Sequence, residues 1–257
     1  MSELQIHMFP ALQDNYCYLL HDPDSGKTGV VDTPEVAAIE KALADTGWSL
    51  DYILNTHHHW DHAGGNLELK ERHGCQVVGP AADAERIPGI DITLADGDQF
   101  ELGSRRAVVY DTPGHTRGHI VYHFADDQAA FVGDTLFSMG CGRLFEGTPD
   151  QMWTSLSKLI DKLPDDTRIY CAHEYTQSNA RFAVSVEPDN VELVARAQQV
   201  DRLREQGEPT IPSTMALEKA TNPFLRPDSP GIQATLGLPP DDLVAVFAET
   251  RTRKDNF

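Results

Sequence analysis

The stretch Thr56-His57-His58-His59-Trp60-Asp61-His62 is the most informative part of this chain. It follows the apolar run 52–54, which predicts a short buried strand. Its imidazole and carboxylate groups suit Zn²⁺, Fe or Mn²⁺. In an extended loop His57 and His59 point the same way, whereas adjacent side chains such as Asp61 and His62 point oppositely. A loop wrapped around one spot would let the two pairs serve different ions. The alternative is a surface loop that is rich in histidine by chance.

Composition limits the class of protein. The 257 residues, 40% of them hydrophobic, suffice for one large domain or for one domain with a small appendage. No apolar run approaches the ~20 residues of a membrane span, and the start of the chain lacks the pattern of a signal peptide. Four scattered cysteines fit reduced thiols, so we expect a cytoplasmic protein. The net charge of −19 argues against nucleic acid and anionic membranes as partners.

The pattern of apolar and turn-forming residues predicts a mixed α/β region followed by a helical one. Strands are expected at 6–9, 16–21, 28–32, 52–54, 76–78, 106–111, 120–124, 129–132 and 167–171. Helices are expected at 34–46, 66–73, 149–163, 191–206, 214–220 and 241–253. Residues 79–98 and 140–143 are predicted to be loops. Because strand signals stop near Tyr175, we predict domains at 1–175 and 176–257.

Chemically active side chains recur where predicted strands end. His57, His115, Asp134 and His173 each lie just past the carboxyl end of a strand, where ligands bind in layered α/β proteins. If all these strand ends meet at one edge, the available metal ligands are His57, His59, Asp61, His62, His115, Asp134 and His173. Seven protein ligands are too many for one tetrahedral ion, but they suit two ions that share a carboxylate.

With these residues the chain resembles the metallo-β-lactamase superfamily, and more narrowly the glyoxalase II or hydroxyacylglutathione hydrolase family. The superfamily likeness rests on Thr56-His57-x-His59-x-Asp61-His62. The narrower likeness rests on the stretches 112–119, 133–137, 140–147, 172–176, 221–226 and 251–255, so it spans nearly the whole chain. It implies a four-layer αββα sandwich followed by a small all-helical C-terminal domain.

The resemblance also implies a ligand set. His57, His59 and His115 would hold one metal ion, and Asp61, His62 and His173 the other. Asp134 would bridge the two ions together with a water or hydroxide. Zn²⁺ is the favoured metal, with Fe or Mn as alternatives. On the same grounds we expect Asp134, Asp61 and His59 to serve catalysis, and Asp32 to orient a ligand.

The implied reaction is hydrolysis of S-2-hydroxyacylglutathione thioesters, in the usual case S-D-lactoylglutathione, as the second step of methylglyoxal detoxification. Its products are glutathione and a 2-hydroxy acid. The resemblance places Arg143, Tyr175, Arg251 and Lys254 around the glutathione. Phe145 stands where some relatives have tyrosine, so it cannot donate a hydroxyl hydrogen bond. We expect a monomer that binds neither nucleic acid nor a membrane.

Two other readings stay open from the sequence. One is another enzyme of the superfamily, such as a persulfide dioxygenase, a lactonase or a nuclease; the acidity of the chain disfavours the nuclease. The other is a non-catalytic scaffold, which the presence of all seven ligand residues disfavours. Thiol catalysis by Cys141 or Cys171 is also disfavoured, because the neighbouring histidines and acids are already assigned to metal.

Overall fold

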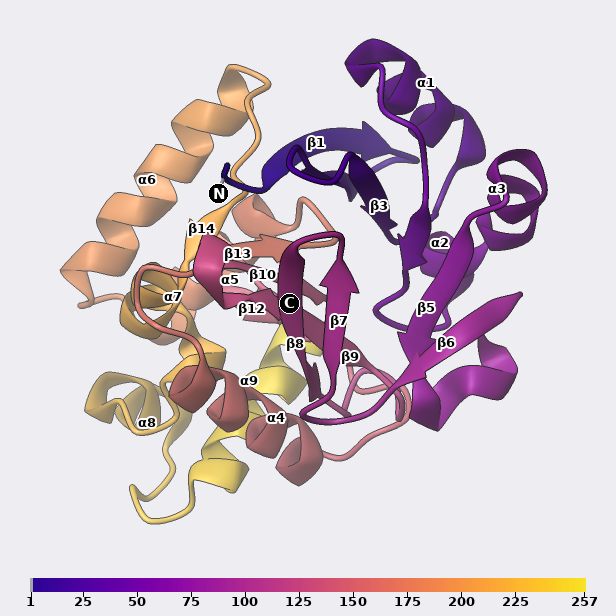
Figure 1. Cartoon of the computed structure of the whole chain (residues 1–257). Coiled ribbons are helices and arrows are strands. Elements are labelled where there is room, and N and C mark those ends of the chain that lie inside the picture. The colour runs from indigo at the N-terminus through magenta and orange to yellow at the C-terminus, as the bar shows by residue number, and fades with distance from the viewer. Residues whose placement is uncertain (1) are drawn as a thin grey trace. The chain divides into compact units, whose positions relative to one another are not determined.

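The computed structural model describes residues 2–257, which fold into two compact units (Figure 1). The first unit comprises the chain up to Thr112 together with Arg117–Gly133. The second comprises Pro113–Thr116 and Asp134–Phe257. The predicted domain boundary near residue 175 stays a prediction. By its contacts, however, the segment that contains Asp134 and His173 belongs with the helical part of the chain.

The first unit contains a six-stranded sheet in which the strands follow chain order. The first two pairings are antiparallel and the last three are parallel. The strands are β1 Gln5–Ala11, β2 Asn15–Asp22, β3 Lys27–Val31, β4 Tyr52–Leu54, β5 Gln76–Pro80 and β6 Ile90–Leu94. The helices between them are α1 Val36–Thr46, α2 Trp60–Ala63, α3 Asn66–His73 and the 3₁₀ segment η1 Ala81–Arg86.

A second, antiparallel group of strands completes this unit. It consists of β7 Gln99–Leu102, β8 Arg105–Asp111, β9 Ile120–Phe124 and β10 Ala129–Gly133, with the 3₁₀ turn η2 Ala125–Asp127. Tyr18 on β2 packs against Phe131 on β10, with ring centroids 5.4 Å apart. Likewise Tyr52 packs edge-on against Phe100 at 5.3 Å. These contacts bury one face of the six-stranded sheet against the second group.

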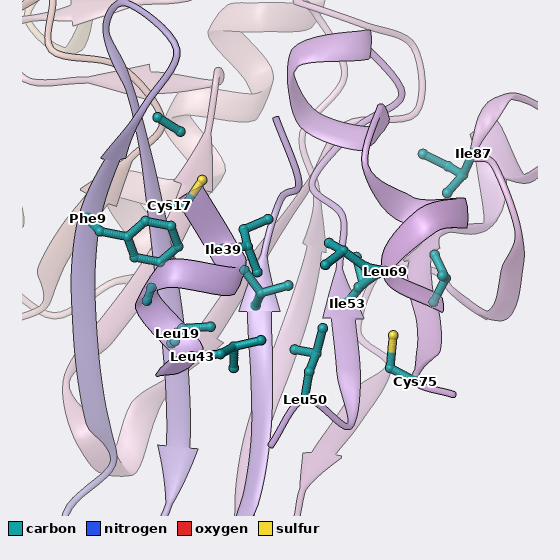
Figure 2. Close-up of a cluster of buried hydrophobic side chains, with 14 residues drawn as sticks. Phe9, Cys17, Leu19, Ile39, Leu43, Leu50, Ile53, Leu69, Cys75 and Ile87 are labelled. Carbon is teal, nitrogen blue, oxygen red and sulfur yellow. The ribbon is translucent and has the colours of Figure 1, made fainter. Parts of the chain in front are cut away.

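The opposite face of the six-stranded sheet is covered by helices. Figure 2 shows the buried cluster that joins Ile39 and Leu43 of α1 and Leu69 of α3 to strand residues such as Leu19 and Ile53. Buried side chains alternate along these strands because one set faces the helices and the other faces the second group of strands. The first unit therefore has three layers: helices, the six-stranded sheet and the antiparallel strands.

The second unit is mainly helical. Its helices are α4 Pro149–Lys162, α5 Thr176–Val186, α6 Val191–Glu205, α7 Met215–Thr221, α8 Pro230–Leu236 and α9 Leu243–Asp255, with the 3₁₀ turn η3 Pro223–Leu225. Its strands are β11 Leu136–Phe137, β12 Gly140–Cys141, β13 Arg168–Cys171 and β14 Ser213–Thr214. The helix expected at 149–163 is present as α4, and it begins with a capping box in which Thr148 and Gln151 bond each other's backbone. None of the helices in residues 2–257 has both the length and the apolar character that crossing a bilayer requires.

Several elements differ from the sequence-based prediction. The predicted loop 79–98 contains η1 and β6, and Gly140–Cys141 is a strand rather than a loop. The sequence Ile90-Asp91-Ile92-Thr93-Leu94 alternates as a half-buried strand should, but the surrounding prolines and glycines conceal the pattern. The short strands β11 and β12 carry no periodicity of their own, because two residues are too few to show one.

A buried ion pair links the two groups of strands in the first unit. Arg105 on β8 reaches Asp22 on β2 at 3.5 Å and Asp127 at 3.2 Å, and the Asp22 side chain is fully buried. Burial alone would raise the pKa of Asp22. Hydrogen bonds from Ser25 and Ser104 outweigh that effect and hold its pKa well below the usual value.

We therefore expect Asp22→Asn to lower the free energy of unfolding by about 3 kcal/mol at pH 7, the order found when one partner of a buried pair is removed. Because the pKa of Asp22 is lower in the folded protein, its stabilisation is present above the unfolded pKa of about 3.9 and is lost as pH falls below it. Denaturant unfolding at pH 7 and at about pH 3, below the unfolded pKa, measures both effects. Asp126→Asn, at an exposed position, serves as the control; equal stability of the two variants at pH 7 would contradict the prediction.

Candidate metal centre

The histidine-rich stretch lies in the first unit and connects β4 to α2 and α3. His57 and His62 are buried, and Nε2 of His57 lies 3.0 Å from Nδ1 of His59. The rings of His57 and His62 lie 4.0 Å apart. Nε2 of His62 lies 3.5 Å from a carboxylate oxygen of Asp61. The side chains that were expected to act in pairs are therefore gathered in one small region of this unit.

Asp32 anchors this loop from the end of β3. Its backbone is in the left-handed region, with φ of 58°, and its side chain is buried. The carboxylate accepts hydrogen bonds from the backbone N–H and the hydroxyl of Thr56, both at 2.8 Å, and lies 2.8 Å from Nδ1 of His62. The expectation that Asp32 contacts a predicted ligand is confirmed. With Nδ1 donating to Asp32, Nε2 of His62 keeps its lone pair for a metal ion.

The loop is also held by His119, just before β9, and by contacts from His58 to η1. His119 is buried and stacks on His57, with ring centroids 4.9 Å apart, and its Nδ1 lies 3.1 Å from the hydroxyl of Thr112. His58 contacts Asp83 and Arg86, at 3.2 Å and 3.0 Å. His119 therefore packs against a predicted ligand, and His58 joins the loop to η1.

The second unit contains the other three predicted ligands. His115 and His173 each direct Nε2 at Asp134, at 3.4 Å to opposite oxygens of the carboxylate. All three side chains are buried. Nδ1 of His115 lies 2.8 Å from the backbone carbonyl oxygen of Arg143, so this nitrogen carries the proton and Nε2 is left for a metal. Asp134 therefore presents each of its two oxygens to a different imidazole.

The donor set in each unit fits divalent metal ions. Neutral imidazole nitrogens and carboxylate oxygens are the groups that Zn²⁺ and related ions bind. In His62 and His115, Nδ1 faces a fixed oxygen acceptor, which is the Asp32 carboxylate for His62 and the Arg143 carbonyl for His115. In both residues Nε2 lies on the other side of the ring and faces a neighbouring carboxylate. That arrangement is the usual support of a metal-ligating histidine.

The predicted substrate-binding residues also lie in the second unit. The ring of Tyr175 stacks on His173 with a centroid distance of 4.8 Å and is 38% exposed. Lys254 donates to the Ser178 hydroxyl at 3.0 Å. Arg251 is buried over the Phe224 ring and donates to the Cys141 carbonyl at 2.9 Å.

Positive charge is concentrated around Lys254. Arg143 and Arg251 both contact Asp255, at 3.8 Å and 2.8 Å, so these two guanidinium groups share one carboxylate. Burial, assisted by the charges of Arg251 and Arg143, lowers the pKa of Lys254 to about 8. In a chain of net charge −19 this group, Arg143, Arg251 and Lys254, is a local concentration of positive charge.

Other polar and aromatic groups near these residues have simpler roles. Burial raises the pKa of Cys141 to about 11 and of Cys171 to about 12, so both are uncharged thiols at neutral pH and poor nucleophiles. Phe145 is 63% exposed and places its ring 5.2 Å from that of His115. Sequence reasoning missed Asp83, whose only signal was a short acidic stretch in a predicted loop.

Comparison with known proteins identifies the superfamily. Residues 13–173 match the family model of the metallo-beta-lactamase superfamily. A crystal structure described as ETHE1 from Myxococcus xanthus is similar over 100% of both chains, with a TM-score of 0.67 and 24% identity, which shows the shared fold. The chain therefore belongs to the metallo-β-lactamase superfamily, and the expected fold is confirmed.

A narrower family follows from the rest of the chain. Residues 174–257 match the model described as the hydroxyacylglutathione hydrolase C-terminus. A protein of Maricaulis maris named hydroxyacylglutathione hydrolase is 58% identical over 257 residues, which is 100% of both chains. One of the same name from Methylococcus capsulatus is 57% identical over 254 residues, 99% of both. This chain belongs to the hydroxyacylglutathione hydrolase family.

We expect Asp32→Asn to weaken Zn²⁺ binding 10- to 100-fold, the order seen when a group that orients a ligand is changed. The amide replaces one acceptor oxygen by an NH₂ donor, so it cannot accept all three hydrogen bonds that Asp32 accepts, from the Thr56 N–H, the Thr56 hydroxyl and His62. Competition with a chromogenic chelator measures the affinity. The exposed Asp45→Asn is the control, and an unchanged affinity in Asp32→Asn would show that this carboxylate does not support a metal ligand.

Proposed function

We propose that this protein hydrolyses S-2-hydroxyacylglutathione thioesters, with S-D-lactoylglutathione as the representative substrate. The observation that carries the proposal is that relatives named hydroxyacylglutathione hydrolase match the chain from end to end at more than half identity. The C-terminal match covers the part of the chain that contributes Lys254 and Arg251. On this reading the reaction is the second step of methylglyoxal detoxification.

We further propose that seven side chains hold two metal ions. His57, His59 and His115 serve one ion, Asp61, His62 and His173 serve the other, and Asp134 bridges them. When bound, the ions supply Lewis acidity and lower the pKa of a coordinated water. The favoured ion is Zn²⁺, with Fe or Mn as alternatives. The support is the family motif and the donor geometry within each unit.

The chain's own residues prepare the site for this chemistry. Asp32 and the carbonyl of Arg143 orient the rings of His62 and His115, so that Nε2 of each is directed away from these acceptors. In hydrolysis, water oxygen bonds to the acyl carbon, the carbon–sulfur bond breaks, and glutathione leaves as a thiolate. A thiolate is a weak base, with the pKa of an ordinary thiol near 8.5, so no general acid is needed to assist it. Asp134, Asp61 and His59 are the proposed catalytic residues.

The basic group Arg143, Arg251 and Lys254, with Tyr175, is proposed to bind the peptide part of glutathione, which carries two carboxylates. Arg143 is 65% exposed in its side chain and is the most accessible of the three. Arg251 is buried, so its main service to the substrate is to add positive charge and to hold the backbone at Cys141. We also propose a cytoplasmic location, consistent with four buried and unbridged cysteines. A monomeric state stays a prediction.

The proposal predicts loss of thioester absorbance when Zn²⁺-loaded protein meets S-D-lactoylglutathione, with release of one thiol per thioester. Asp134→Ala is expected to abolish this turnover, because it removes the carboxylate between His115 and His173. Stable thioester in the presence of metal-loaded wild-type protein would overturn the proposal. Turnover of glutathione persulfide or of lactones instead would assign the site to another reaction of the superfamily.

The lowered pKa of Lys254 predicts how the KM for the substrate depends on pH. Lys254→Ala is expected to raise KM about tenfold and to leave kcat unchanged, because it removes a charged contact shared by ground and transition states. In wild type KM should rise as pH passes about 8, since the pKa of Lys254 is lowered and its positive charge is lost above that value.

Steady-state kinetics between pH 6.5 and 9.5 would measure this trend. Lys254→Arg is the matched control, because arginine keeps its charge throughout this range and should flatten the dependence of KM on pH. A wild-type KM that is independent of pH, together with an unaffected Lys254→Ala, would remove Lys254 from the glutathione site.

A further inference from the structure

A short hairpin in the second unit, with two residues in each strand, lies between the predicted ligand Asp134 and Arg143 of the basic group. Its strands β11 and β12 pair Leu136 with Cys141 and Phe137 with Gly140. The turn places Met139 at φ of 53°, a left-handed conformation that residues other than glycine seldom adopt. Hairpins this short are not stable by themselves in water. Its shape must therefore be imposed by the residues packed around it.

The side chain of Asn222 binds the closing pair of this hairpin. Asn222 is fully buried, and its Nδ2 donates to the carbonyl oxygens of Phe137 and Gly140 at 3.1 Å and 3.0 Å. The same nitrogen lies 3.0 Å from a carboxylate oxygen of Glu218. The side-chain oxygen of Asn222 accepts from the backbone N–H of Phe224 at 3.0 Å, so the carboxamide cannot rotate without losing bonds on both sides. This is the asparagine of the stretch 221–226 that carried part of the family resemblance.

Glu218 and two neighbours hold the turn itself. The buried carboxylate of Glu218 accepts from the backbone N–H of Met139 at 2.9 Å. Arg196, which is paired with Glu218, also donates to the hydroxyl of Ser138 at 2.8 Å. Asn179 donates to the carbonyl of Ser138 at 3.1 Å. Side chains from α5, α6 and α7 thus fix the turn that the sequence alone would leave undetermined.

The two ends of the hairpin carry functional groups. Asp134 lies two residues before β11, and Gly142 follows β12. A Cβ atom at Gly142 would lie only 2.0 Å from the Asp134 carbonyl oxygen and 3.0 Å from Nδ1 of His115, so these backbones touch. The carbonyl of Arg143 is the acceptor that orients His115, and Arg251 bonds the Cys141 carbonyl. A shift of the hairpin would therefore move both ligands and the basic group together.

We propose that Asn222, supported by Glu218, is a positioning residue for the metal ligands Asp134 and His115, an inference that rests on the proposed function. Asn222 contacts neither ligand, and it acts by fixing the carbonyl groups of the hairpin that connects them. In this way the helical C-terminal part sets the geometry of the metal centre as well as supplying Lys254 and Arg251. This role would explain why the stretch 221–226 contains an asparagine.

The test compares Asn222→Ala with Asn190→Ala, a matched control in the same unit. Asn190 also makes three side-chain hydrogen bonds, to Glu187, the Ala220 carbonyl and the Leu193 N–H, but none to the hairpin. Each variant is assayed for thermal stability, for Zn²⁺ affinity by chelator competition, and for kcat and KM when metal-loaded. We expect both to lower Tm, but only Asn222→Ala to weaken Zn²⁺ binding, by about tenfold, and to reduce kcat more than it raises KM.

Two outcomes would overturn the inference. One is that Asn222→Ala and Asn190→Ala lower Tm alike and both bind Zn²⁺ as wild type does. The other applies if Asn222→Ala does not fold. Asn179→Ala, which removes one bond to the Ser138 carbonyl, then replaces it, and an unchanged Zn²⁺ affinity in Asn179→Ala would overturn the inference. If wild type binds Zn²⁺ but leaves S-D-lactoylglutathione intact, the proposed function fails while the affinities still test this inference.

Discussion

The burial of Asp32 and His62 against each other is the constraint on which the histidine-rich loop depends. A carboxylate with so little exposure must be compensated, and Asp32 is satisfied by the Thr56 backbone, the Thr56 hydroxyl and His62 at once. Those three bonds fix where the loop leaves β4 and which nitrogen of His62 carries the proton. In the second unit the Arg143 carbonyl has the same effect on His115. Each unit thus presents an imidazole whose Nε2 faces a carboxylate oxygen.

The helical part of the chain is more than a support for the substrate. It contributes the basic group around Lys254, whose positive charge contrasts with the net negative charge of the chain. Its helices also form hydrogen bonds to the hairpin between Asp134 and Arg143. The contacts therefore group Asp134 and His173 with the C-terminal helices, although the superfamily match ends at residue 173. On the proposed function, binding of the glutathione part and placement of the ligands Asp134 and His115 would depend on the same packed segment.

Much of this arrangement was predictable because it rests on local signals. The strand–ligand junctions at His57, His115, Asp134 and His173 follow from apolar runs that end in polar residues, and the structure has strands before all four. The capped helix at Pro149 follows from its capping box. The hairpin β11–β12 was missed because its stability comes from Asn222, about 80 residues away, and no local pattern records such a contact. The burial of Arg251 could not be predicted from the sequence either, because a charged residue near a chain end is normally expected to be exposed to solvent.

The central proposal is that the seven predicted ligand side chains hold two metal ions. Native mass spectrometry of the Zn²⁺-loaded protein, beside Asp134→Ala, tests it most directly because it counts bound ions without reference to any substrate. The account predicts two ions on each wild-type chain, and loss of at least one from Asp134→Ala, since that carboxylate serves both. A single ion per wild-type chain, or two ions that persist in Asp134→Ala, would contradict it.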